Sequence, residues 1–330
     1  MLNDTLFVPT NHCLGKLLCD GHSLHHIMNK ITVVGVGNLG SCIAYEIASR
    51  GIADKIILVD VYQELSEGNA ADISQAMAFR NNTKVVAGNY EDAYGSKVVV
   101  VTAGKPRTPD MKSRMELLKA NKKIITSVAT SLKQLRETPT IITLTNPVDV
   151  MNYVMWKSTN SDRKRVLGSA GMLDSARFRT VLSNMYDVPI LDVDAYVIGE
   201  HGDNQIPVFS QVAIKKHKKR FTEEQRLEIM SRLKESALQV ISKKGATIYA
   251  PASNTANMIE TILKDEKKVF ICSVVLDEEY SLKGVSLGVP VVLGCDGVEK
   301  VVEWDLDDYE RKLFYKGAEQ LKETIKAMTI

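Results

Sequence analysis

The chain of 330 residues is longer than one typical hydrophobic core supports, so two domains are expected. Its 45% hydrophobic and 25% charged residues are ordinary for a globular protein, and a net charge of +2 gives no general attraction to nucleic acid or to anionic membranes. No apolar run approaches the ~20 residues that cross a bilayer. The composition therefore predicts neither a nucleic-acid partner nor a membrane protein.

Residues 1–29 are predicted to form an N-terminal extension, either disordered or upstream of the true start, because they show no helical or strand periodicity. They contain Cys13, Cys19, His22, His25 and His26, but this spacing fits no standard zinc site, so no metal is predicted. The five cysteines of the chain form no CxxC pair, which is typical of reduced thiols and favours a cytoplasmic location.

Residues 30–151 alternate short β-branched runs with helix-like segments. Strands are predicted over 30–37, 55–60, 83–88, 96–104 and 140–149, and helices over 38–51, 63–80 and 113–135. The run SKVVVVTAG is almost wholly apolar, as a strand buried on both faces of a parallel sheet is. Strands separated by helices of this length predict an α/β domain with a doubly wound parallel sheet.

Residues 152–330 follow a different pattern, which predicts a second, mixed α+β domain. Helices are expected over 173–186, 222–245 and 254–265 and from about residue 305, with strands over 193–199, 269–276 and 284–294. The basic run KKHKKR at 215–220 lacks interleaved aromatic residues and is soon followed by the acidic TEEQ. It is interpreted as a solvated loop rather than as a polyanion-binding patch.

The loop GVGNLG has the GxGxxG spacing, follows a predicted strand and opens a predicted helix. An acidic residue ends the next strand, where it can accept hydrogen bonds from the ribose of a dinucleotide. This context predicts a Rossmann domain that binds NAD; NADP is the less favoured alternative, because the carboxylate repels a ribose phosphate. The predicted cofactor-binding residues here are Gly35, Val36, Gly37, Asn38, Leu39, Gly40 and Asp60.

Four further stretches carry polar groups suited to a small anionic substrate. Arg107 and Arg114 lie in a proline-containing loop after the fourth strand, and LTNPVD ends the next strand. In LDSARFR, Asp174 and Arg177 are spaced to share one helix face. His201 lies in GEHGD, and histidine is the usual proton donor at neutral pH.

Together these motifs resemble the lactate/malate dehydrogenase family, and most closely its malate dehydrogenases of archaeal type. The resemblance runs from about residue 30 to near the C-terminus, and NPVDVMNY and KGATIYAPA agree with it. It implies reversible hydride transfer between NADH and a 2-keto acid. His201 is then the proton donor to the ketone oxygen, and Asp174 the residue that holds its imidazole in one tautomer.

The resemblance also implies the substrate contacts. Arg177 grips the substrate carboxylate, Arg114 polarises the carbonyl, and Asn146 orients the substrate and meets the nicotinamide. Asn121 resembles a cofactor-contacting position, and Thr247 one that lines the substrate pocket. A packed helix residue is the alternative for Thr247, and ordinary surface ion pairs or solvated loop charges are the alternatives for the others.

Arg107 decides between keto acids. The matching position in lactate enzymes resembles a neutral glutamine, whereas arginine after proline, as in KPR here, is typical of malate enzymes. An arginine there pairs with the second carboxylate of oxaloacetate, whereas pyruvate leaves it unpaired. L-malate is therefore the predicted product. An L-lactate or broader 2-hydroxy acid dehydrogenase is the alternative, and a non-catalytic NAD-binding protein a further one.

Two departures from the family pattern stand out. The loop PRTPDMKSR is one residue longer than the usual PRKPGMSR and has Asp110 in place of a glycine, which affects the expected turnover more than the reaction type. The segment between His201 and the next long helix is shorter than usual. That segment often contributes to subunit contacts, so the resemblance leaves a homotetramer or a homodimer open.

Overall fold

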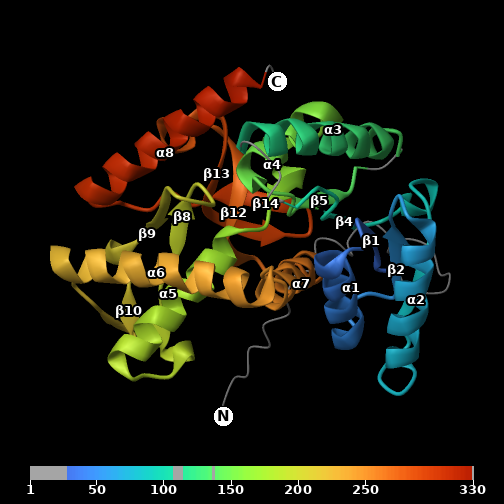
Figure 1. The fold of residues 1–330 in the computed structure, drawn as a ribbon, viewed down its shortest axis with the longest axis horizontal. Coiled ribbons are helices and arrows are strands. Elements are labelled where there is room, and N and C mark those ends of the chain that lie inside the picture. Colours follow the sequence, from blue (N-terminus) through green and yellow to red (C-terminus); the bar gives the residue numbers. More distant parts are fainter. Residues whose placement is uncertain (1–27, 107–113, 136–137, 329–330) are drawn as a thin grey trace, which may run out of the picture.

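The computed structural model describes residues 28–106, 114–135 and 138–328 (Figure 1). The strands of this part are β1 (Lys30–Val34), β2 (Lys55–Val59), β3 (Lys84–Ala87), β4 (Val98–Val101), β5 (Thr140–Thr143), β6 (Val166–Gly168), β7 (Val193–Asp194), β8 (Val197–Gly199), β9 (Gln205–Pro207), β10 (Ala213–Ile214), β11 (His217–Lys218), β12 (Lys268–Asp277), β13 (Lys283–Gly294) and β14 (Gly297–Val301). The α-helices are α1 (Asn38–Arg50), α2 (Gln63–Met77), α3 (Arg114–Lys133), α4 (Val148–Thr159), α5 (Gly171–Tyr186), α6 (Glu223–Lys244), α7 (Tyr249–Lys264) and α8 (Asp308–Ala327).

One long sheet joins the two halves of the described chain, in the order β3-β2-β1-β4-β5-β6-β12-β13-β8-β9, with β14 beside β13. The strands β3 to β6 pair in parallel, and from β12 onward the pairing is antiparallel. A small second sheet has the order β11-β10-β7. The predicted fold class, a doubly wound parallel sheet followed by a mixed α/β half, is confirmed.

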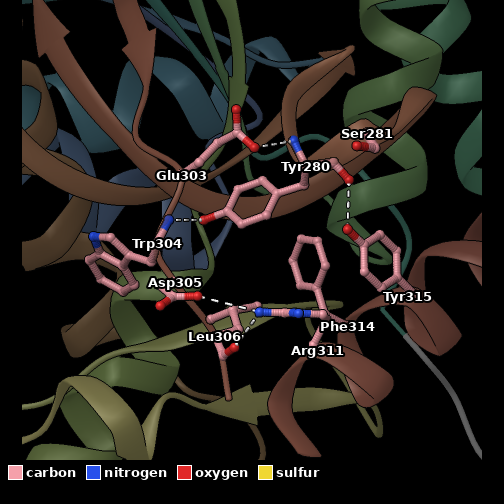
Figure 2. A pocket seen from close by; sticks show the side chains of 9 residues that line it. All are labelled: Tyr280, Ser281, Glu303, Trp304, Asp305, Leu306, Arg311, Phe314 and Tyr315. Carbon is pink, nitrogen blue, oxygen red and sulfur yellow. Dashed lines mark hydrogen bonds and ion pairs between the residues drawn. The ribbon is translucent and has the colours of Figure 1, made fainter. Parts of the chain in front are cut away.

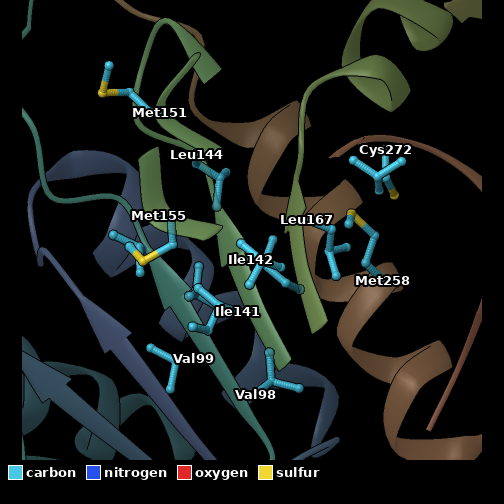
Figure 3. Close-up of a cluster of buried hydrophobic side chains, with 14 of the residues drawn as sticks. Val98, Val99, Ile141, Ile142, Leu144, Met151, Met155, Leu167, Met258 and Cys272 are labelled. Atoms are coloured by element: carbon cyan, nitrogen blue, oxygen red, sulfur yellow. The ribbon is translucent and has the colours of Figure 1, made fainter. Parts of the chain in front are cut away.

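Helices cover both faces of the parallel strands because those strands are apolar on both sides. All four valines of β4 are fully buried. Helices α3 and α4 contact each other on one face, and α1 contacts α2 and α7 on the other (Figure 1). Figure 3 shows part of the resulting core, in which Met155 of α4 and Met258 of α7 lie among side chains of β4, β5 and β6.

A second hydrophobic cluster fixes the position of α5. Phe178 of α5 is fully buried, and its ring packs edge-on against Phe209, with 5.4 Å between the centroids. Ile229 and Leu233 of α6 complete the cluster. Because Phe178 faces this core, the neighbouring Arg177 and the first-turn Asp174 are held in a defined orientation.

Several predicted elements are wrong in detail. The strand expected over 140–149 ends at Thr143, and Val148 begins the unpredicted helix α4. The strand expected over 193–199 is divided into β7 and β8, and the helix expected from residue 254 begins at Tyr249. The basic run is not a loop throughout, because β10 and β11 pair as a hairpin whose turn residues, Lys215 and Lys216, have positive φ.

The cysteine prediction holds in part. Cys42 and Cys272 are free thiols, whereas Cys295 is disulfide-bonded, which corrects the expectation of reduced thiols for that residue. Over the described ranges, no helix combines the length and apolar character required to cross a membrane. The extension over residues 1–27, with its cysteines and histidines, lies outside the described residues.

Candidate active site

Most of the predicted site residues follow the carboxyl ends of neighbouring parallel strands. The glycine loop follows β1, Asp60 follows β2, Asn146 follows β5, and Asp174 lies in the helix after β6. The sheet reverses its strand order between β1 and β4, and ligands of such sheets bind beyond the carboxyl ends at that reversal. The topology therefore gathers these residues at one edge.

His201 and Asp174 form a buried pair. The Nδ1 atom of His201 lies 2.6 Å from Oδ2 of Asp174, whose side chain is only 4% exposed. A carboxylate accepts only, so it fixes the neutral imidazole as the tautomer with hydrogen on Nδ1. No hydrogen bond to Nε2 occurs among the described residues. That nitrogen is therefore available to exchange a proton with a ligand.

Arg177 extends this pair. Its Nη1 donates to Oδ1 of Asp174 at 3.0 Å, and its Nη2 lies 3.4 Å from the hydroxyl of Thr247. The Arg177 side chain is 14% exposed, so the alternative of a solvated surface pair with Asp174 is wrong. A guanidinium has five N–H groups, and these contacts leave others for a ligand carboxylate.

The carboxylates around His201 favour its protonated form. Burial by itself lowers the pKa of His201, but the charge and hydrogen bond of Asp174, together with the charge of Asp149, outweigh it. The pKa of His201 is therefore raised above its usual value. An imidazole of this kind can hold a proton near neutrality and release it to a nearby oxygen.

The comparisons with known proteins identify the family. Residues 29–168 match the lactate/malate dehydrogenase NAD-binding domain, and residues 171–329 match the lactate/malate dehydrogenase alpha/beta C-terminal domain. The chain belongs to the lactate/malate dehydrogenase family.

Relatives and solved structures agree. A malate dehydrogenase from Halobacterium salinarum is 46% identical over 297 residues, which cover 89% of this chain and 97% of that protein. A malate dehydrogenase structure from Cryptosporidium parvum has a TM-score of 0.86 at 34% identity, covering 92% of this chain and 99% of that one. A Cryptosporidium parvum lactate dehydrogenase complexed with lactic acid and NAD has a TM-score of 0.86 at 35% identity, covering 92% and 98%. The fold itself does not separate the two activities.

The glycine loop of this lactate/malate dehydrogenase family member fits a dinucleotide. Gly35 has φ of +90°, and a Cβ on Gly40 would lie 1.9 Å from the carbonyl oxygen of Gly35, so these two glycines allow the loop to pack. A Cβ on Gly37 would meet nothing within 4 Å. Gly37 is also the N-cap of α1, which has no side-chain cap and no acidic residue in its first turn. This open, uncapped helix end suits a pyrophosphate.

The other residues of this loop differ in exposure. Asn38 is exposed, Leu39 is half-buried, and Val36 is buried with its N–H donating to Oδ2 of Asp60 at 2.7 Å. Oδ1 of Asp60 accepts from the N–H of Tyr62 at 3.1 Å. Each carboxylate oxygen keeps a further lone pair, so Asp60 can both anchor the loop and accept ribose hydroxyls.

Asn121 and Asn146 are connected. Both amide hydrogens of the buried Asn121 are donated within the protein, to the carbonyl oxygens of Asn146 at 2.7 Å and of Lys105 at 3.2 Å. Its Oδ1 accepts from the N–H of Lys105 at 2.8 Å. Asn121 therefore braces the loops after β4 and β5. The side chain of Asn146 is exposed and makes no hydrogen bond to any described residue.

Two predicted substrate residues cannot be placed. Arg107 lies outside the described residues. Arg114 begins α3, but its side chain is also outside the described part. In the described ranges, no group of three or more metal-ligating side chains occurs.

Sequence reasoning missed Asp149, which lies within the TNPVD motif. Its carboxylate is fully buried and accepts the backbone N–H of His201 at 2.8 Å. A signal was present, because Asp149 and Asn152 are the polar residues of the apolar stretch PVDVMNYVM and their spacing sets them on one helix face.

Two cavities elsewhere contain none of these residues. One, of about 160 Å³, is lined by Tyr280, Ser281, Glu303, Trp304, Asp305, Leu306, Arg311, Phe314 and Tyr315. Figure 2 shows that its polar groups pair internally: Tyr280 accepts the N–H of Trp304, Tyr315 donates to the carbonyl of Tyr280, and Arg311 contacts Asp305. The other is a groove of about 790 Å³ between α3 and the end of α8.

Proposed function

We propose that this protein is an NAD-dependent malate dehydrogenase, which interconverts oxaloacetate plus NADH and L-malate plus NAD. The observation that carries the proposal is the buried Asp174 carboxylate, which contacts both the proton donor His201 and the anion-binding Arg177. The identity with the halobacterial malate dehydrogenase supports the choice of substrate.

His201 supplies and removes the proton. In the reducing direction its Nε2–H faces the ketone oxygen, and the imidazolium is stabilised by Asp174 at Nδ1. Bound NADH supplies the hydride to the carbonyl carbon. As the C=O bond becomes C–OH, His201 gives up its proton and becomes neutral. In the reverse direction the neutral imidazole takes the hydroxyl proton of malate.

The arginines hold the diacid. Arg177 binds the carboxylate next to the ketone through the N–H groups that Asp174 and Thr247 leave available. We assign Arg114 to the ketone oxygen, Arg107 to the second carboxylate and Asn146 to the substrate and the nicotinamide end. A clamp at both ends fixes the reacting carbon, and such positioning accounts for much of an enzyme's rate.

Steady-state rates with oxaloacetate and pyruvate, each measured with NADH and NADPH, test the proposal. We expect oxaloacetate with NADH to give the highest kcat/KM. Faster turnover of pyruvate would instead identify an L-lactate or broader 2-hydroxy acid dehydrogenase. If NADH binds but is oxidised by no 2-keto acid, the protein is a non-catalytic NAD-binding protein.

Three further features belong to the proposal. We propose a homodimer or homotetramer, supported by exposed apolar side chains beside the ends of α2 and on α6, among them Tyr62, Phe79 and Leu238. We propose a cytoplasmic location, which fractionation of cells would test. We also propose an N-terminal extension over residues 1–29, a dinucleotide-binding domain over 30–151 and a catalytic domain over 152–330, which limited proteolysis would test.

A further inference from the structure

A chain of buried polar groups leads to the backbone N–H of His201, whereas Asp174 contacts its imidazole ring. Oδ2 of Asp149 accepts the N–H of His201 at 2.8 Å, and Oδ1 accepts the hydroxyl of Ser273 at 2.6 Å. The hydroxyl of Ser286 lies 3.0 Å from that of Ser273 and also accepts from Nδ2 of Asn152 at 3.0 Å. These groups come from α4, β12 and β13, which all lie in the rigid core.

The direction of this chain is fixed at both ends. Nδ2 of Asn152 also donates to the backbone carbonyl of Ser273 at 3.0 Å, so the amide nitrogen must face Ser286. Ser286 therefore donates to Ser273, and Ser273 donates to Asp149. At its other oxygen Asp149 meets a backbone N–H, which is also a donor. Both carboxylate oxygens thus accept hydrogen bonds, and these two bonds favour the ionised form of Asp149.

We propose that Asp149 is a positioning residue for the reaction: its ionised carboxylate, held by the Asn152–Ser286–Ser273 chain, fixes the backbone of His201 and helps to keep its imidazole protonated. The proposal rests on the proposed function for His201. It adds a second carboxylate to the one at Nδ1, and this second one acts through the main chain and through its charge.

The electrostatics agree with the geometry. Burial raises the pKa of Asp149 to about 6, which still leaves it ionised at neutral pH. Its negative charge raises the pKa of His201, as does that of Asp174, whereas Arg177 lowers it. Glu200, next to His201 in the chain, is the remaining charged group that acts on Asp149. Ser273 and Ser286, from β12 and β13, carry no charge.

The test uses Asp149→Asn in the full-length protein. The amide oxygen can still accept the N–H of His201, so the shape is kept and the charge is removed. We expect kcat/KM for oxaloacetate to fall about 10- to 100-fold, because general acid–base catalysis contributes about 10²–10⁴-fold and the lost charge weakens the proton donor. NADH affinity should change little. We also expect the fall in kcat/KM with rising pH, which we assign to loss of the proton from His201, to move to lower pH. Asp162→Asn, at an exposed helix cap, is the matched control and should match wild type.

A second readout does not depend on turnover. The chain has six histidines, so the His201 signal in a spectrum of ¹⁵N-histidine-labelled protein with NADH bound can be identified by its absence in His201→Gln. Its titration should shift to lower pH in Asp149→Asn, and by less in Ser273→Ala, which keeps the carboxylate but removes one donor. A merely structural role would lower stability without moving this titration.

The outcomes separate the two proposals. If none of the keto acids supports NADH oxidation by the wild-type protein, the proposed function fails. The histidine titration then still decides the role of Asp149. If oxaloacetate is reduced but the His201 titration is the same in wild type, Asp149→Asn and Ser273→Ala, the role of Asp149 is overturned alone. Should Asp149→Asn not fold, the shift or its absence in Ser273→Ala gives the same decision.

Discussion

At the scale of single residues, Asp174 has two tasks, since one oxygen orients His201 and the other contacts Arg177. In Asp174→Asn the amide can no longer impose one tautomer or stabilise the imidazolium, so kcat should fall by about 10²–10⁴-fold. Asp174 raises the pKa of His201, so its loss lowers that pKa.

The sign of the pH effect follows from the protonation state that each direction needs. Oxaloacetate reduction requires protonated His201. As pH rises, the rate of this reduction should therefore fall at a lower pH in Asp174→Asn than in wild type. Malate oxidation requires neutral His201 and should begin at lower pH. Rates in both directions across pH measure this, with Asp194→Asn, in an exposed pair with Arg179, as the control. If the pH dependence of both rates is the same in Asp174→Asn as in wild type, the role given to Asp174 is contradicted.

At this scale we propose that Arg107 selects the substrate. In Arg107→Gln the proposed partner of the second carboxylate is lost, and pyruvate no longer leaves a charge without a partner at this position. Losing such a pair typically costs about 2–5 kcal/mol, so the ratio of kcat/KM for oxaloacetate over pyruvate should fall roughly 30- to 5,000-fold. Lys105→Gln, in the same loop, should leave the ratio near that of wild type. An unchanged ratio in Arg107→Gln would show that another residue selects the substrate.

At the scale of elements, two glycines of the glycine loop have different expected roles: Gly40 in packing and Gly37 in cofactor binding. Gly37 has φ of −68° and open space where a Cβ would be, so Gly37→Ala should keep the urea midpoint of wild type. Its methyl group would occupy the surface proposed for the pyrophosphate, and we expect NADH to bind at least about tenfold more weakly, or 1.4 kcal/mol.

Gly40→Ala is the matched comparison. Its Cβ would lie 1.9 Å from the oxygen of Gly35 and 2.8 Å from the hydroxyl of Thr102, so the helix must move away from the sheet. We expect a loss of about 1–3 kcal/mol in unfolding free energy. Urea unfolding and NADH fluorescence titration measure the two effects. Equal stability losses in both variants would contradict the open space at Gly37, and unchanged NADH affinity in Gly37→Ala would contradict its role in binding.

Sequence patterns predicted the elements whose periodicity is local and strong. The strands of the parallel sheet were found because buried valine and isoleucine runs are separated by amphipathic helices. Helix α4 was missed because nine of its twelve residues are buried, so it has no solvent-exposed polar face and its apolar run resembles a strand. The β10–β11 hairpin was missed because its turn uses two lysines at positive φ, where glycine or asparagine is the usual signal.

The candidate site was predicted unevenly for a similar reason. Motif residues such as His201 and Arg177 carry recognisable chemistry in a fixed order along the chain. Asp149 acts through contacts with His201 and Ser273, which are distant in sequence, and only the packing of α4 against β12 brings them together. The sequence marks Asp149 only as a polar residue in an apolar stretch, and it gives no local signal for the distant groups that Asp149 contacts.

At the scale of the whole molecule, the continuous sheet runs through both halves of the described chain, and residues from both halves form the candidate site. The strand β6 pairs with β5 on one side and with β12 on the other, and Asp149 of α4 binds the loop that follows β8. His201 is therefore anchored to the half of the chain that carries the glycine loop. The proposed proton donor and the proposed cofactor site are therefore held together by the shared core.

Large apolar side chains remain exposed on the surface of the whole molecule. At the two ends of α2, Val61 is 91% exposed and Phe79 is fully exposed, and large apolar side chains in such positions mark contact surfaces. If they meet a second copy of the chain, a charge at either position would be buried without a partner. The double variant Val61→Glu/Phe79→Glu should therefore run as a smaller species than wild type at micromolar concentration.

Size-exclusion chromatography with light scattering measures this directly. Tyr94→Glu, which places a charge at an exposed aromatic position outside α2, after the turn Glu91–Ala93, should keep the wild-type mass. Circular dichroism on the double variant must match wild type, so that a change in mass reports assembly and not unfolding. A wild-type protein that is monomeric at these concentrations would refute the homo-oligomer, and an unchanged mass in the folded double variant would assign the contact to another surface such as α6.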